Sequence, residues 1–220
     1  MKVVQERQKQ MKHQQMVSGM SFVSYWCGQF VIDLLVALFT CLLLVAIVHI
    51  YNVKGFLGEA EPPFIVSILL FLISVLPLTY VLSFLFDSPN KAQGSLAALY
   101  ILLGLMFAIV TFVLMNINSD TVSANNVLKY FFRASPPYCL AYSLIFIFSK
   151  SASGASSFFQ NESYWNYNLI GKNLVAMAVN AILYFSFLLL IEYMSAFPTL
   201  MTKLGFNIDI PKEVELFFFL

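Results

Sequence analysis

The residues of this 220-residue chain that could take part in chemistry are polar side chains set within long apolar runs. Within each run they recur at spacings of three, four or seven, so they share one face of a helix. They are Gln29 and Asp33, continued by Ala37 and Thr40, in the first run, and Asn173, Asn180 and Tyr184, with Ala176, in the last. Such faces should meet a substrate or the interior of a helix bundle, because facing lipid is costly.

Asp33 is the one carboxylate well inside an apolar run. A functional interpretation makes it a contact for a substrate or a counter-ion. A structural interpretation, which we favour, makes it a paired charge near one end of a helix, within reach of water. His49 lies sixteen positions later, about 160° around an ideal helix, so the two residues cannot form one proton-relay site in a straight helix.

Catalytic and cofactor motifs are missing from the sequence. The string Gly171-Lys172-Asn173 lacks the upstream glycine and the hydroxyl residue of a phosphate-binding loop, so it cannot bind ATP in that way. No metalloprotease or serine-hydrolase motif occurs, and the three cysteines have no metal-ligand spacing. We therefore expect no catalytic, cofactor-binding or metal-binding residue, and the chain by itself is not expected to be an enzyme.

The composition is that of an integral membrane protein. Hydrophobic residues make up 60% of the chain, charged residues make up 10%, and the mean hydropathy is +0.82. A soluble domain carries about 25% charged residues, so lipid must cover most of this surface. The net charge of +1 offers no basic field for nucleic acid.

Four apolar runs are long enough to cross a bilayer, which needs about 20 apolar residues in a helix. They occupy residues 25–50, 64–86, 95–116 and 169–193. The sequence therefore predicts an all-α, multi-pass membrane helix bundle over residues 22–193. In the third span a stripe of small residues should let another helix approach closely. The members of the stripe are Gly94, Ala97, Gly104, Ala108 and Thr111, with the large Ile101 as the exception.

Two further features concern local helix geometry. Pro77 stands in the middle of the second span and should kink it, with Ser74 satisfying part of the freed backbone. The fifth apolar run, 138–148, would reach only about 17 Å. Together with 127–132, and separated from it by Pro136 and Pro137, it predicts a re-entrant helical hairpin over about 127–148 in the outer leaflet, packed on the bundle.

The distribution of charge gives a side to each connection. Residues 1–21 form a polar helix that we place in the cytosol, as we do the turn at 87–94 and the tail or linker at 194–220. Lys and Arg number about seven in these segments and about four in the segments placed outside, a modest bias in the direction of the positive-inside rule. Asn161 begins the one glycosylation sequon and falls in an outside segment, which agrees.

Four strings, in order along nearly the whole chain, resemble the A-subfamily of ABC transporters, the ABCA lipid transporters. The matching residues are 12–19 with Tyr25, Trp26, Phe30 and Asp33; 77–80 with 83–86 and Pro89; Pro136, Cys139, Leu140 and Leu144; and 171–178. The resemblance covers the last four helices of one ABC-2 exporter half and the cytosolic helix before them. It implies a fragment of a longer transporter, without the first two helices, the extracytosolic domain or the ATPase.

The resemblance also implies roles and partners. Residues 5–19 would be a coupling helix that rests on a nucleotide-binding domain, with contact candidates Glu6, Arg7, Lys9, Lys12 and His13. That domain, with ATP and Mg, and a second transmembrane half would lie elsewhere in the polypeptide or be supplied in trans, and lipids would be the substrate.

Three alternatives stay open. The polar segment could be a basic juxtamembrane segment drawn to anionic lipid. The chain could be a truncated, non-transporting protein that binds or regulates a related transporter. It could also be an ATP-independent channel or carrier.

Overall fold

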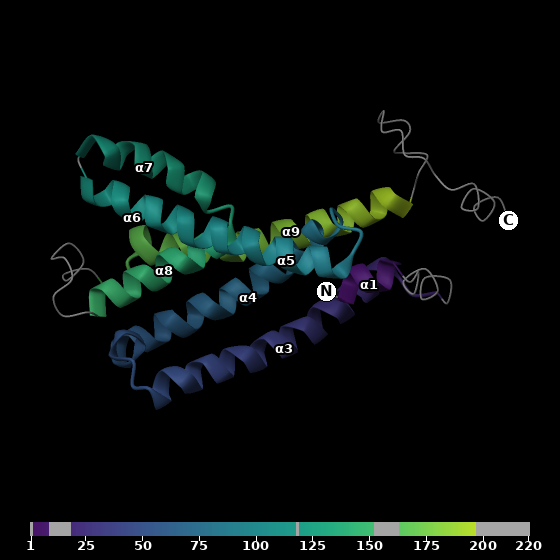
Figure 1. The fold of residues 1–220 in the computed structure, drawn as a ribbon, viewed down its shortest axis with the longest axis horizontal. Helices are drawn as coiled ribbons and strands as arrows, with labels where there is room; N and C mark the ends of the chain where they lie inside the picture. Colours follow the sequence, from purple (N-terminus) through teal and green to yellow (C-terminus); the bar gives the residue numbers. More distant parts are fainter. Residues whose placement is uncertain (1, 9–18, 118, 152–162, 197–220) are drawn as a thin grey trace.

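The computed structural model describes residues 2–8, 19–117, 119–151 and 163–196 (Figure 1). These ranges are helical and contain no strand, which confirms the all-α membrane bundle. The α-helices are α1 (Lys2–Gln8), α3 (Phe22–Ile50), α4 (Glu61–Ser83), α5 (Pro89–Ile101), α6 (Phe107–Ile117), α7 (Ser119–Phe132), α8 (Pro136–Ser151) and α9 (Lys172–Ala196). The 3-10 turns η1 (Lys54–Phe56) and η2 (Gly58–Ala60) precede α4, and the π turns η3 (Leu102–Met106) and η4 (Tyr167–Gly171) precede α6 and α9.

Four helical stretches in the described residues have the length and apolar composition to cross a membrane. They cover Phe22–Ile50, Gly58–Ser83, Pro89–Leu114 and Tyr167–Met194. Each begins a few residues before the predicted span, because helices start at caps and prolines rather than at the first apolar residue. The Ser21 side chain accepts from the backbone N–H of Ser24, and prolines stand in the first turns of α4 and α5.

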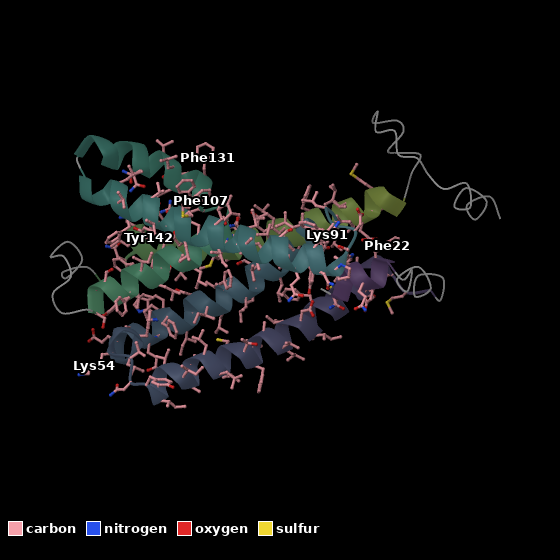
Figure 2. All side chains as sticks on the ribbon, in the orientation of Figure 1. Phe22, Lys54, Lys91, Phe107, Phe131 and Tyr142 are labelled. Carbon is pink, nitrogen blue, oxygen red and sulfur yellow. The ribbon has the colours of Figure 1, made fainter. Side chains whose placement is uncertain are left out.

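The two ends of the bundle hold different sets of connections. In Figure 1, α1, the link from α4 to α5 and the end of α9 gather at one end, and the link from α3 to α4, the end of α6 and the start of α7 lie at the other. Figure 2 shows Phe22 and Lys91 at the first end and Lys54 at the second. The described parts of 1–21, 87–94 and 194–220, which were predicted to share a side of the membrane, thus share an end of the bundle. Which end faces the cytosol stays a prediction.

Helix α4 lies at the centre and packs against α3, α8 and α9. Its buried serines bond within the helix: Ser67 Oγ donates to the Pro63 carbonyl at 2.7 Å, and Ser83 Oγ donates to the Tyr80 carbonyl at 2.6 Å. Ser74 Oγ donates to the Phe71 carbonyl at 3.0 Å. The carbonyl that Pro77 frees belongs to the residue four positions earlier, so the expectation that Ser74 serves that group is wrong.

The small-residue stripe of the third span is only half correct. Gly104, Ala108 and Thr111 are buried, but Gly94 and Ala97 are exposed, and Ala92 and Leu96 are buried in their place. The cause is η3, because a π turn acts as a one-residue insertion in an α-helix. The contact face therefore shifts by one position between α5 and α6, and a regular α-helical projection misplaces its first half.

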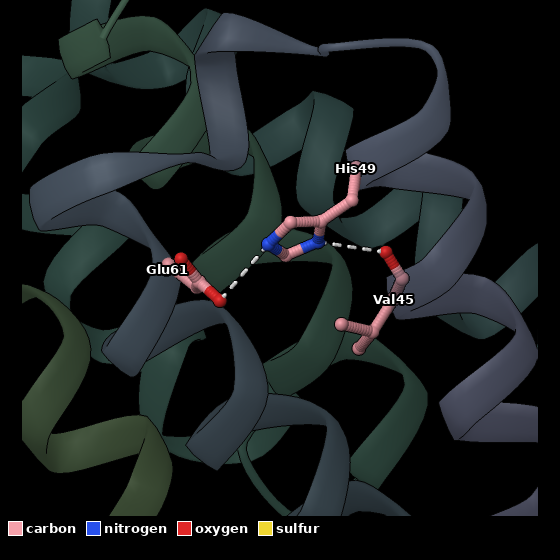
Figure 3. Close-up of polar contacts among 3 residues, drawn as sticks. All are labelled: Val45, His49 and Glu61. Carbon is pink, nitrogen blue, oxygen red and sulfur yellow. Dashed lines mark hydrogen bonds and ion pairs between the residues drawn. The ribbon is translucent and has the colours of Figure 1, made fainter.

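Helix α3 lies at the edge of the bundle with much of its apolar surface exposed. Thr40 was predicted to face inward, but it is exposed. Its hydroxyl needs no partner in the bundle, because it donates to the Val36 carbonyl of the same helix at 3.1 Å. At the far end of α3, His49 Nε2 lies 3.3 Å from a carboxylate oxygen of Glu61, and His49 Nδ1 lies 3.0 Å from the Val45 carbonyl (Figure 3). This contact joins the end of α3 to the first turn of α4.

Candidate functional site

The predicted hairpin is formed by α7 and α8, joined by the short link Arg133-Ala134-Ser135. Helix α8 begins at Pro136, as the proline pair predicts. The hairpin covers Ser119–Ser151 and is longer than the predicted 127–148, because the polar start of α7 is helical. Asn125 explains part of this difference: it is fully buried and donates to the Thr111 carbonyl on α6 at 3.2 Å. Immersion of the hairpin in the outer leaflet stays a prediction.

The tip of the hairpin is held by α9 through two polar side chains. Asn180 Nδ2 donates to the carbonyls of Arg133, at 2.7 Å, and Ala134, at 3.3 Å. The Tyr184 hydroxyl donates to the same Ala134 carbonyl. These carbonyls lie where the chain is not helical, so they have no intrahelical donor. The polar stripe on α9 thus serves backbone groups that the hairpin turn leaves unpaired.

The opposite side of the tip rests on the third span. A Cβ at Gly104 would lie 3.2 Å from the Pro137 carbonyl oxygen and 3.3 Å from its Cβ, so the glycine permits this close approach. Phe132 stacks on Phe107 with ring centroids 4.2 Å apart. Figure 2 shows Phe107 and Tyr142 within this part of the bundle and Phe131 on the outside of α7. The turn is therefore wedged between α9 and the third span.

Arg133 is a functional candidate that the sequence analysis missed. Its Nε donates to Asn173 Oδ1 at 2.9 Å, and its guanidinium carbon lies 5.6 Å from the centroid of the Tyr130 ring. One helical turn earlier, burial lowers the pKa of Lys129 to about 8, and the positive charges of Arg133 and Lys172 act in the same direction. The polar stripe on α9 was the only sequence signal for Arg133. It indicated that some polar partner faces the stripe, but residue spacing alone does not identify that partner.

Gln29 and Asp33, predicted on an inward face of the first span, make a separate polar group. One carboxylate oxygen of Asp33 accepts from the Tyr80 hydroxyl at 2.6 Å and from Gln29 Nε2 at 2.9 Å. Asp33 is partly buried, and these contacts link α3 to α4; whether the carboxylate serves the structure or a substrate stays a prediction. The structure does not join this group to Asn173, Asn180 and Tyr184, which contact the hairpin instead.

A third group ties α1 to the bundle. Tyr25 donates to a Glu6 carboxylate oxygen at 2.7 Å, and the buried Val3 packs in one apolar cluster with Trp26. Trp26 is fully buried and donates from Nε1 to a carboxylate oxygen of Glu192, on α9, at 3.2 Å. Thus α1 contacts a cluster built from α3, α4 and α9.

Several predicted positions lie outside the described residues or side chains. Arg7 is in α1, but its side chain is outside them. Lys9, Lys12, His13 and Asn161 lie outside altogether, as do residues 197–220, which make up most of the 194–220 tail. Their predicted roles in coupling, glycosylation and linkage are therefore untested.

Comparison with known proteins agrees with this architecture. The model of the ABC-2 family transporter proteins matches residues 1–190. The retinal-specific phospholipid-transporting ATPase ABCA4 of Bos taurus is 33% identical over 87% of this chain, which spans 9% of that relative. The phospholipid-transporting ATPase ABCA7 of Homo sapiens is 29% identical over 88% of this chain and 9% of its own length. ABC transporter A family member 6 of Dictyostelium discoideum is 26% identical over 87% of this chain and 12% of its own length.

Proposed function

The chain belongs to the ABC-2 family of transporter proteins, and we propose that it forms part of the lipid path of an ATP-driven transporter. It is a transporter membrane domain with A-subfamily transporters as relatives. Two of those relatives are named as phospholipid-transporting ATPases, which supports phospholipids as the substrate class. A bundle whose outer surface is apolar suits a substrate that already lives in the bilayer.

Energy for this transport has to come from another domain. The only sequence near a phosphate-binding loop, Gly171-Lys172-Asn173, lacks the required glycine and hydroxyl, and its Gly171 and Lys172 join η4 to α9 at the start of a spanning helix. The residues present therefore do not fit ATP and Mg. We propose that a nucleotide-binding domain and a second transmembrane half complete the transporter, in the same polypeptide or in trans.

The observation that carries the coupling part of the proposal is the attachment of α1 to the bundle. In α1, Glu6 accepts a hydrogen bond from Tyr25. Val3 packs in the apolar cluster that α3, α4 and α9 build. Packed side chains transmit displacement because cores have low compressibility. Movement of a domain resting on residues 5–19 would therefore shift three spanning helices together. Glu6, Arg7, Lys9, Lys12 and His13 are the proposed contacts with that domain.

A pair of variants tests the coupling role in the transporter that carries this chain. Tyr25→Phe removes the bond to Glu6 but keeps the ring, and the triple change of Arg7, Lys9 and Lys12 to Ala removes the basic contacts. Each should lower lipid-stimulated ATP hydrolysis by about fivefold or more, the low end of ordinary coupling energies, with basal hydrolysis and membrane insertion unchanged. The control is Lys54→Ala, at the opposite end of the bundle. Unchanged stimulation in both variants would refute the coupling role.

Reconstitution tests the transport function itself. The chain, tagged and isolated with whatever it assembles with, is placed in liposomes that contain a fluorescent phospholipid, and movement between leaflets is measured with and without Mg-ATP. ATP-dependent movement supports the proposal. Movement without ATP identifies a channel or carrier. Absence of movement, together with a changed activity of a co-purified transporter, identifies a regulator.

A further inference from the structure

The hairpin and the start of α9 leave one buried side-chain amide donor without an acceptor among the described residues. Arg133 Nε donates to Asn173 Oδ1 at 2.9 Å, which fixes the orientation of the amide because a guanidinium nitrogen can only donate. The Asn173 Nδ2 group then has no hydrogen-bond partner among the residues that the structure describes. Asn173 is only 1% exposed. A buried donor without an acceptor is costly, so this amide needs an acceptor from outside the described residues.

The same place gathers positive charge. The Arg133 backbone N–H donates to the Lys129 carbonyl at 3.0 Å, so the side chains of these two residues lie one helical turn apart and on the same face. Lys172 directly precedes Asn173 at the start of α9. Lys129, Arg133 and Lys172 are each partly buried, and Lys129 Nζ lies 5.4 Å from the centroid of the Tyr142 ring. The cations are therefore partly desolvated.

No acidic residue occurs at positions 121–151 or 163–191, which include α8, η4 and nearly all of α7 and α9. These stretches therefore supply no carboxylate to the cluster, and Asp120 of α7 and Glu192 of α9 lie outside them. The partly buried charges of Arg133 and Lys172 need a counter-ion. A phosphate group fits both needs, because its oxygens accept several hydrogen bonds at once and guanidinium and ammonium groups are its usual partners.

We propose that Arg133, Lys172 and Asn173 form a binding site for a phosphate group, most simply that of a phospholipid headgroup entering between the hairpin and α9. We call these three residues the hairpin cation site. The inference rests on the proposed lipid path and adds to it the part of the substrate that is recognised. A free phosphate ion would satisfy the same donors, so the test has to separate the two sources.

The experiment measures binding to the full chain in dodecyl maltoside, a detergent without phosphate. Native mass spectrometry compares phosphatidic acid with diacylglycerol of the same acyl chains, which lacks only the phosphate. The expected result is about tenfold or tighter binding of phosphatidic acid, the scale of one charge-assisted hydrogen bond. Equal binding of the two lipids would overturn the proposal. Addition of inorganic phosphate separates the sources: displacement at a matched concentration identifies the free ion, and retention identifies the lipid.

Asn173→Asp is the sharpest variant, because it keeps an acceptor for Arg133 while it removes the unpartnered donor and adds a negative charge. Its thermal stability should equal or exceed that of the unaltered chain, and its preference for phosphatidic acid should disappear. Lys172→Gln, which leaves the bond between Arg133 and Asn173 intact, should weaken the preference severalfold. Lys54→Gln, distant in the bundle, is the matched control and should keep it. A preference that survives both Asn173→Asp and Lys172→Gln would refute the site.

These measurements are independent of transport, since they use neither ATP nor a second domain. A chain that binds phosphatidic acid through the hairpin cation site but moves no lipid in liposomes would sustain the site and refute the transport function. A chain that supports ATP-dependent lipid movement but binds both lipids equally would sustain the transport function and refute the site.

Discussion

The clamp between α9 and the hairpin tip can be weakened by one nearly isosteric change, Asn180→Leu. The leucine fills the volume of the amide but donates nothing to the carbonyls of Arg133 and Ala134, which Asn180 contacts at 2.7 and 3.3 Å. Hydrogen bonds between membrane helices average about 0.6 kcal/mol and reach about 1.7 kcal/mol. Two bonds to turn carbonyls without an intrahelical partner should therefore cost about 1–2 kcal/mol for detachment of the tip.

Cys139 reports this detachment directly. Its side chain is fully buried beside the tip, and its Sγ donates to the Arg133 carbonyl at 3.4 Å. In a chain that carries Cys27→Ser and Cys41→Ala, Cys139 is the remaining thiol. A loss of about 1–2 kcal/mol corresponds to roughly 5–30-fold more of the open form. The rate of reaction with the membrane-permeant N-ethylmaleimide should rise by that factor.

The control is Val179→Leu, a change at the neighbouring α9 position, where the side chain is 47% exposed. It should leave the labelling rate within about twofold, because substitutions away from packed features shift stability by less than about 0.5 kcal/mol. If Asn180→Leu labelled no faster than Val179→Leu, the two hydrogen bonds would not hold the tip, and the clamp would be wrong.

Three further predictions concern the packing around these groups and are tested by thermal unfolding in detergent. Gly104→Leu presses a side chain into the first turn of α8 and should cost about 1–3 kcal/mol, whereas Gly94→Leu, with open space around its Cβ position, should not lower the melting temperature. Trp26→Phe removes the bond to the buried Glu192 carboxylate and should cost about 1.5–3 kcal/mol, so an unchanged melting temperature would contradict that contact. His49→Gln should cost less than about 1 kcal/mol, because the ion pair is half exposed, and a larger loss would show that the contact is structural.

The sequence by itself determined the solvent, the number of spanning helices and the break before α8. Apolar runs of sufficient length have few alternatives to a membrane helix, because every backbone group must be satisfied within the segment. Pro136 cannot continue a preceding helix, so it marks the start of the next one. The polar stripe at Asn173, Asn180 and Tyr184 was visible for the same kind of reason, since its spacing follows from helix geometry alone.

Only the tertiary structure decided what those polar residues contact. The partners of Asn180 are backbone carbonyls, which carry no sequence signature, and Arg133 reaches Asn173 across forty positions of chain. The buried face of the third span depended on the π turn η3, whose single extra residue shifts the register between Leu96 and Gly104. Local periodicity fixes which residues share a face, but the neighbour that each face meets depends on how separate helices pack, and that choice is made by the whole bundle.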